Sequence, residues 1–186
     1  MTQAPQKNTG GTKELAARLM AVQACYQMLQ NGGSPREITR EFLEHRTEME
    51  DLDGTPLPQA DGALFKRIMI GVEERRIELD EMLYAHIKGR EYVKAEGELS
   101  GAETPDMIQD GGHFVPAEKT RDIEPLLRSV MMCGICEILM HGNIDHPLII
   151  NDYLDITHAF YEKQQVSLVN GVLDSIATLL RTGEKV

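Results

Sequence analysis

Apolar residues recur at steps of three and four along most of this 186-residue chain, which is the period of an amphipathic helix. The stretch that begins at Lys13 shows the pattern well, and its apolar positions are Leu15, Leu19, Val22, Cys25, Tyr26 and Leu29. The same period returns over residues 35–43, 61–87, 122–140, 147–160 and 166–180. No stretch alternates every second residue as a half-buried strand would. The sequence therefore predicts an all-α fold.

Glycine and proline indicate where these helices begin and end. Asn31-Gly32-Gly33 is expected to end the first helix, and Ser34-Pro35 with Glu37 is typical of a capping box that starts the second. The periodicity does not decide whether residues 61–87 form one helix or a broken pair. Asn170-Gly171 lies inside a helical pattern, where a glycine is unfavourable. It indicates either a close approach by a neighbouring helix or a break.

The chain is expected to form one compact domain with two helical lobes, over residues 13–88 and 121–182. Residues 1–12 are polar and glycine-rich, which predicts a disordered tail. Residues 89–120 are acidic and rich in glycine, with little periodic apolar content. They are predicted to be a long surface loop between the lobes, and disorder is the favoured interpretation.

The net charge of −11 argues, taken alone, against a nucleic-acid partner. The charge is uneven, because acid gathers over residues 41–61 and 96–124 while residues 1–20 are slightly basic. Such runs are usually solvated faces. The more specific interpretation is that an acidic flank meets a basic protein partner while the basic end meets phosphate.

Cys25, Cys133 and Cys136 all lie in apolar stretches, and their odd number without a secretory leader predicts a reducing, cytoplasmic location. Cys133 and Cys136 with His141 and His146 have a spacing close to that of a zinc knuckle. Apolar residues interleave with the cysteines, however, so we favour a buried helix, with no metal or other cofactor. The apolar run that contains it is too short to span a bilayer, and no membrane partner is expected.

No constellation typical of catalysis is found, since the chain has no phosphate-binding glycine loop, nucleophile elbow or metalloprotease helix. We expect a binding protein and not an enzyme. On the first helix, Arg18 could reach a phosphate, Gln23 could contact a base edge and Tyr26 could stack on an unpaired base. The alternative interpretation is a surface charge and a core ring.

Several segments together carry a resemblance. They are Pro147–Phe160, followed by Leu168-Val-Asn-Gly-Val-Leu-Asp174; Leu126-Leu-Arg-Ser-Val with Glu137-Ile-Leu139; and Ala17-Arg18 with Ala21-Val-Gln-Ala-Cys-Tyr26. In these motifs the chain resembles the NusB family of bacterial transcription antitermination factors. The resemblance covers nearly all of residues 13–180.

The resemblance implies a two-lobed bundle of about seven helices. It also implies binding of boxA-type RNA together with the ribosomal protein NusE, which supports elongation by RNA polymerase. The implied RNA contacts lie on the first helix and between the last two helices, at Lys13, Arg18, Gln23, Tyr26, Lys163, Gln165 and Leu168. A basic protein partner would meet acidic side chains at Glu118, Asp122 and Glu124.

The chain departs from the family pattern in having fewer arginines around the first helix. Fewer phosphate contacts predict a low affinity for RNA alone and a shallow salt dependence, so that NusE contributes more to binding. The alternative is a NusB-fold adaptor or homodimer that has lost sequence-specific RNA binding.

Overall fold

In a computed structural model, the described residues are 12–45, 58–87, 108–110, 113–115, 123–141 and 146–183. They form seven α-helices and one short β-hairpin, which confirms the predicted all-α class. The elements are α1 (Lys13–Asn31), α2 (Pro35–His45), α3 (Gly62–Glu74), α4 (Arg76–Ile87), β1 (Ile108–Asp110), β2 (His113–Val115), α5 (Pro125–Met140), α6 (His146–Phe160) and α7 (Lys163–Thr182).

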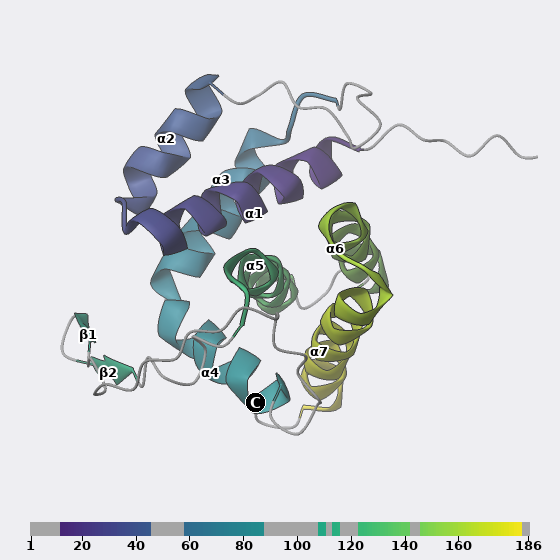
Figure 1. Cartoon of the computed structure of the whole chain (residues 1–186). Helices are drawn as coiled ribbons and strands as arrows, with labels where there is room; N and C mark the ends of the chain where they lie inside the picture. Colours follow the sequence, from purple (N-terminus) through teal and green to yellow (C-terminus); the bar gives the residue numbers. More distant parts are fainter. Residues whose placement is uncertain are drawn as a thin grey trace, which may run out of the picture.

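Helix α5 lies at the centre of the bundle, as Figure 1 shows, and packs against α1, α3, α4, α6 and α7. Its side chains are buried without a break from Ser129 to Ile138. A helix that is covered on all sides needs no polar stripe, and this explains its nearly continuous apolar sequence. The buried-helix interpretation of Cys133 and Cys136 is therefore confirmed. No helix in the described part of the chain is both long and apolar enough to cross a membrane.

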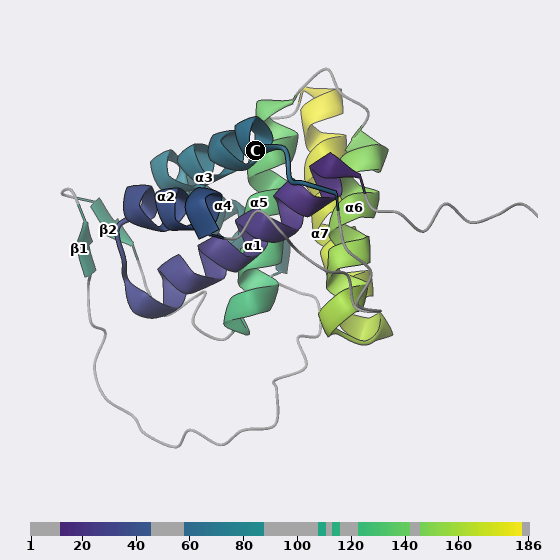
Figure 2. The ribbon, with the colours of Figure 1, turned by 90° about the horizontal axis from the view of Figure 1, so that it is seen from above.

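Helix α1 crosses α5 and also packs against α3 (Figure 2). Small residues occupy much of its buried face, at Ala16, Ala17, Ala21 and Ala24. Because their side chains end at Cβ, two other helices can approach its backbone closely. On the other flank of α5, helices α6 and α7 lie against each other.

Most helix ends lie where the sequence predicts them. Gly32 ends α1 with a φ of 64°, a left-handed conformation that glycine adopts without strain. Residues 61–87 form a broken pair, since Arg75 leaves helical geometry between α3 and α4. Helix α7 continues through Asn170-Gly171 without a break, so the alternative prediction of a helix break at this dipeptide is wrong.

The β-hairpin differs from the predicted surface loop over residues 89–120. Strands β1 and β2 pair antiparallel, with Gln109 opposite Phe114. Each strand has three residues, too few to show a period of two in the sequence. The signal that was present is Gly111-Gly112, a dipeptide type that favours two-residue hairpin turns. The remainder of this segment, and the predicted tail as far as residue 11, lie outside the described residues.

A close approach between helices is found at Gly134 on α5. A Cβ added to Gly134 would lie 2.9 Å from Cδ2 of Leu173 on α7 and 3.4 Å from Cδ2 of Tyr153 on α6. Both side chains are fully buried, so neither can move aside without disturbing its own packing. Glycine at this position lets α6 and α7 both pack onto α5.

We expect Gly134→Ala to lower the free energy of unfolding by about 1 kcal/mol, since overpacking outweighs the gain in helix propensity. Leu173→Val should relieve part of the clash. The double variant is then expected to be less destabilised than the sum of the single variants in urea unfolding. Additive losses of stability would show that contact with Leu173 is not what makes a side chain at position 134 unfavourable.

Candidate functional site

A groove of about 720 Å³ lies where the second half of α1 meets the start of α5 and the end of α6. Three predicted residues, Gln23, Tyr26 and Glu124, line it together. Its complete lining is Gln23, Tyr26, Gln27, Gln30, Asn31, Glu124, Leu126 and Phe160. The groove therefore brings together side chains that were predicted separately, two as RNA contacts and one as a contact to a protein partner.

Two exposed aromatic rings, from two different helices, line this groove. Tyr26 on α1 is 38% exposed and Phe160 at the end of α6 is 45% exposed. Exposed aromatic rings can stack on unpaired bases, whose faces are apolar and flat. The helical period over residues 147–160 includes Phe160 among its apolar positions, which predicts a buried side chain. Phe160 is instead exposed at the last position of α6, after Thr157, the last buried residue of that helix.

The polar part of the groove consists mainly of amide side chains. Gln23, Gln27 and Gln30 follow one another along a single face of α1, and Asn31 ends the row. Gln27 Nε2 also donates to a carboxylate oxygen of Glu41 at 3.3 Å. Amides both donate and accept hydrogen bonds, as base edges require. Among the described residues that line the groove, none is lysine or arginine.

Glu124 precedes α5 as its N-cap and stabilises the start of that helix, in addition to lining the groove. Its carboxylate accepts hydrogen bonds from the backbone N–H groups of Leu126 at 3.1 Å and Leu127 at 2.9 Å. It also accepts one from the hydroxyl of Tyr161. A negative charge is favourable at the N-terminus of a helix. The other two residues assigned to a protein partner, Glu118 and Asp122, lie outside the described residues.

Arg18 differs from its prediction as an RNA contact, because the structure places it in the core with 7% of its surface exposed. Its Nε lies 2.9 Å from Oε2 of Glu137 on α5, and its Nη1 lies 2.5 Å from Oδ2 of Asp152 on α6. The hydroxyl of Tyr153 donates to Glu137 at 3.0 Å. These groups form the Arg18 network, and they occupy the guanidinium that a phosphate would need.

The pKa shifts in the Arg18 network reflect its burial and its pairing. Burial alone would lower the pKa of Arg18, but the hydrogen bond and charge of Glu137 outweigh it and the pKa is raised. Burial raises the pKa of Asp152, although the nearby Arg18 partly opposes this shift. Burial and the charge of Glu137 also raise the pKa of Tyr153. Arg18 and Tyr153 therefore both remain protonated donors at neutral pH.

The other predicted RNA contacts are not all brought to the groove. Lys13 is exposed at the start of α1, about 15 Å along the helix from Gln23 at 1.5 Å per residue. Lys163 is exposed at the start of α7, immediately after the turn that follows Phe160. Gln165 and Leu168 are half-buried, and Leu168 packs against the core. The Oε1 atom of Gln165 is buried without a hydrogen-bond partner among the described residues.

The cysteine motif has a simple structural role. Cys133 and Cys136 are fully buried on α5, and burial raises the pKa of Cys136 to about 12. A thiol that stays protonated is a poor metal ligand. In the part of the chain that the structure describes, no three His, Cys, Asp or Glu side chains come together as a metal site would require.

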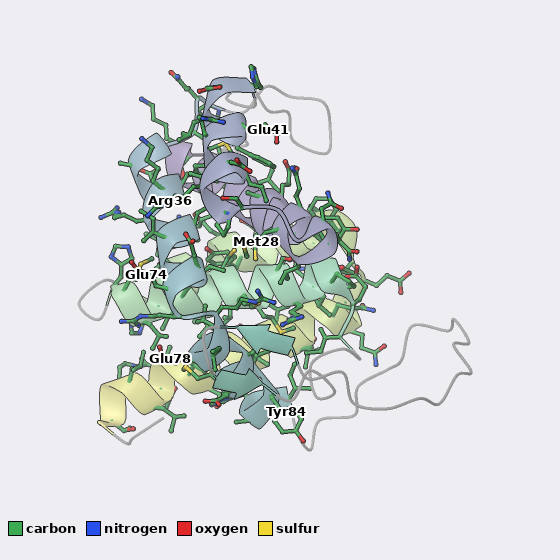
Figure 3. All side chains as sticks on the ribbon, turned by 90° about the vertical axis from the view of Figure 1, so that its left-hand side faces the viewer. Met28, Arg36, Glu41, Glu74, Glu78 and Tyr84 are labelled. Atoms are coloured by element: carbon green, nitrogen blue, oxygen red, sulfur yellow. The ribbon has the colours of Figure 1, made fainter. Side chains whose placement is uncertain are left out.

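A second groove, of about 750 Å³, lies between α2 and α3. Acidic and basic side chains mix on this side of the molecule, where Figure 3 labels Arg36, Glu41 and Glu74. The groove is lined by Arg36, Arg40 and Lys66 but also by Glu44, Glu73 and Glu74. These charges balance, so the groove has no preference for an anionic ligand. The groove beside Tyr26 and Phe160 is the better candidate, and we call it the aromatic groove.

The chain is similar to proteins of one family along most of its length. Residues 15–98 and 112–178 match the NusB family. The chain is 30% identical to the transcription antitermination protein NusB of Nitrobacter hamburgensis over 169 residues, which are 91% of this chain and 88% of that protein. It is 31% identical to the NusB protein of Rhizobium meliloti over 170 residues, 91% and 89% of the two chains. The solution structure of NusB from Aquifex aeolicus has the same fold, with a TM-score of 0.59 at 17% identity, covering 94% and 93% of the chains.

The Arg18 network yields a test of its structural role. Arg18→Gln is expected to lower the free energy of unfolding by about 3–5 kcal/mol, because it leaves Glu137 buried without its cation. Lys13→Gln on the same helix is exposed and should change stability by less than about 0.5 kcal/mol. Urea unfolding of both variants measures the difference. Equal stabilities would mean that Arg18 is not part of the core in solution.

Proposed function

Because this chain belongs to the NusB family, we propose that it is a transcription antitermination factor that binds boxA-type RNA together with the ribosomal protein NusE. In this role it acts in the cytoplasm as a binding protein, not as an enzyme, and reaches the RNA polymerase elongation complex indirectly. The observation that supports RNA as the ligand is the aromatic groove, where Tyr26 and Phe160 expose their rings from two different helices.

The composition of the aromatic groove favours unpaired bases over a duplex. Sequence-specific RNA recognition uses single strands, whose bases can stack on aromatic rings and expose their edges. Tyr26 and Phe160 supply the rings, and Gln23 and Gln30 supply amides for the base edges. The site therefore recognises bases more than phosphates.

Phosphate contacts come from outside the groove and are few. Lys13 and Lys163 are exposed at the starts of α1 and α7, whereas Arg18 is occupied in the core. A basic partner such as NusE would add the missing positive charge, and the chain's net charge of −11 favours its approach. Binding of RNA and binding of NusE therefore support each other.

One observation favours the alternative function, a NusB-fold adaptor or homodimer without sequence-specific RNA binding. The burial of Arg18 removes a cation from a surface that already has few. An RNA mobility-shift assay with and without NusE, comparing boxA with a scrambled sequence, separates the two functions. Preference for boxA in the presence of NusE supports the antitermination role, and equal binding of both sequences supports the adaptor.

We expect Tyr26→Ala and Phe160→Ala each to weaken boxA binding about tenfold, since stacking contributes about 1–3 kcal/mol per base. Fluorescence anisotropy with labelled RNA in the presence of NusE measures the change. Ile70→Ala is the control, because Ile70 is an apolar side chain 50% exposed in the α2–α3 groove. A similar loss in all three variants would contradict a specific role for the aromatic groove.

The salt dependence of RNA binding gives an independent check. If Lys13 and Lys163 make the phosphate contacts, the plot of log K against log salt for the chain without NusE should have a slope of about −1 to −2. A titration from low to moderate salt measures this slope. A slope of about −4 or steeper would require more phosphate contacts than Lys13 and Lys163 can make.

A further inference from the structure

The turn between α6 and α7 contains two residues, Tyr161 and Glu162, and lies beside the aromatic groove. It directly follows Phe160, one of the two aromatic rings of the groove. The backbone N–H of Tyr161 donates to the carbonyl of Thr157 at 2.9 Å, which continues the helical pattern for one more residue. The side-chain hydroxyl of Tyr161 donates to the carboxylate of Glu124 at the start of α5.

Glu124 is a fixed anchor for this hydrogen bond. Its two carboxylate oxygens also accept hydrogen bonds from the N–H groups of Leu126 and Leu127, so it is held at the N-terminus of the buried helix α5. Hydrogen bonds to an ionised acceptor are stronger than neutral ones. The Tyr161 hydroxyl therefore connects the α6–α7 turn to the central helix of the bundle.

The phenyl ring of Phe160 has no hydroxyl and cannot make such a hydrogen bond itself. It is 45% exposed at the last position of α6, and helix ends fray. The other ring of the groove, Tyr26, lies in the fourth turn of the long helix α1. The two rings can hold bases in a defined geometry only if the end of α6 stays in place relative to α1 and α5.

We infer that Tyr161 is a positioning residue for RNA binding, whose hydrogen bond to Glu124 holds Phe160 in place in the aromatic groove. This inference rests on the proposed function. A ring that is already in place loses less conformational freedom when a base binds, so the benefit appears in RNA affinity. Global stability depends on other residues, because the body of α6 is held by buried side chains at Ile149, Tyr153 and Ile156.

The test compares Tyr161→Phe with the native chain for boxA binding in the presence of NusE. The substitution keeps the ring and removes only the hydroxyl, and affinity is expected to fall about three- to tenfold. Tyr84→Phe on α4 is the matched control and should bind like the native chain. In a Phe160→Ala background, Tyr161→Phe is expected to cause no further loss, since the ring that it positions is absent.

A second measurement separates positioning from general destabilisation. Amide hydrogen exchange of Tyr161→Phe should be faster over residues 158–163 and unchanged in α3 and α5. The positioning role is wrong, while the proposed function stands, if Tyr161→Phe binds RNA with the affinity of the native chain. It is also wrong if the substitution lowers RNA affinity by the same factor in the native and Phe160→Ala backgrounds. If the native chain with NusE does not prefer boxA to scrambled RNA, both are wrong.

Discussion

The buried ion pair between Arg18 and Glu137 determines how the three helices around it are arranged. Charges in a protein interior are tolerated only when they are paired and hydrogen-bonded, so each partner fixes the position of the other. Glu137 is held by both Arg18 and Tyr153, and Arg18 in turn reaches Asp152. The pair therefore sets the positions of α1, α5 and α6. These helices also form the aromatic groove, so its shape depends on the network.

This arrangement divides α1 into a half that contributes to the buried network and a half that lines the aromatic groove. The first half of α1 contributes Arg18 to the core, whereas its second half contributes Gln23 and Tyr26 to the groove. A strongly acidic chain gains little from long-range attraction to RNA. A groove of aromatic rings and amides suits such a chain, because stacking and hydrogen bonding to bases do not require positive charge.

Much of the fold could be predicted from the sequence, because the signals for it are local. The left-handed end of α1 follows from Gly32, and the burial of α5 follows from its continuous apolar run. The break between α3 and α4 at Arg75 could not be predicted, because the apolar period continues across it. The short hairpin was missed because three-residue strands are too short to show a period.

The candidate site was less predictable because it depends on long-range contacts. Arg18 lies 119 residues from Glu137 and 134 from Asp152 in the sequence, and no local pattern indicates that they pair. An arginine on a first helix therefore looks like a phosphate contact until its partners are known. Phe160 fits an apolar helix face in the sequence, and its exposure follows only from where the core ends.

On the proposed function, RNA binds in the groove between Tyr26 and Phe160 and leaves the Arg18 network intact. NMR chemical-shift mapping on addition of boxA RNA to the labelled protein in complex with NusE tests it most directly. The largest shifts are expected at Gln23, Tyr26, Gln30 and Phe160, with little change at Arg18 and in the α2–α3 groove. Shifts concentrated on Arg36, Arg40 and Lys66, or none in the aromatic groove, would contradict it.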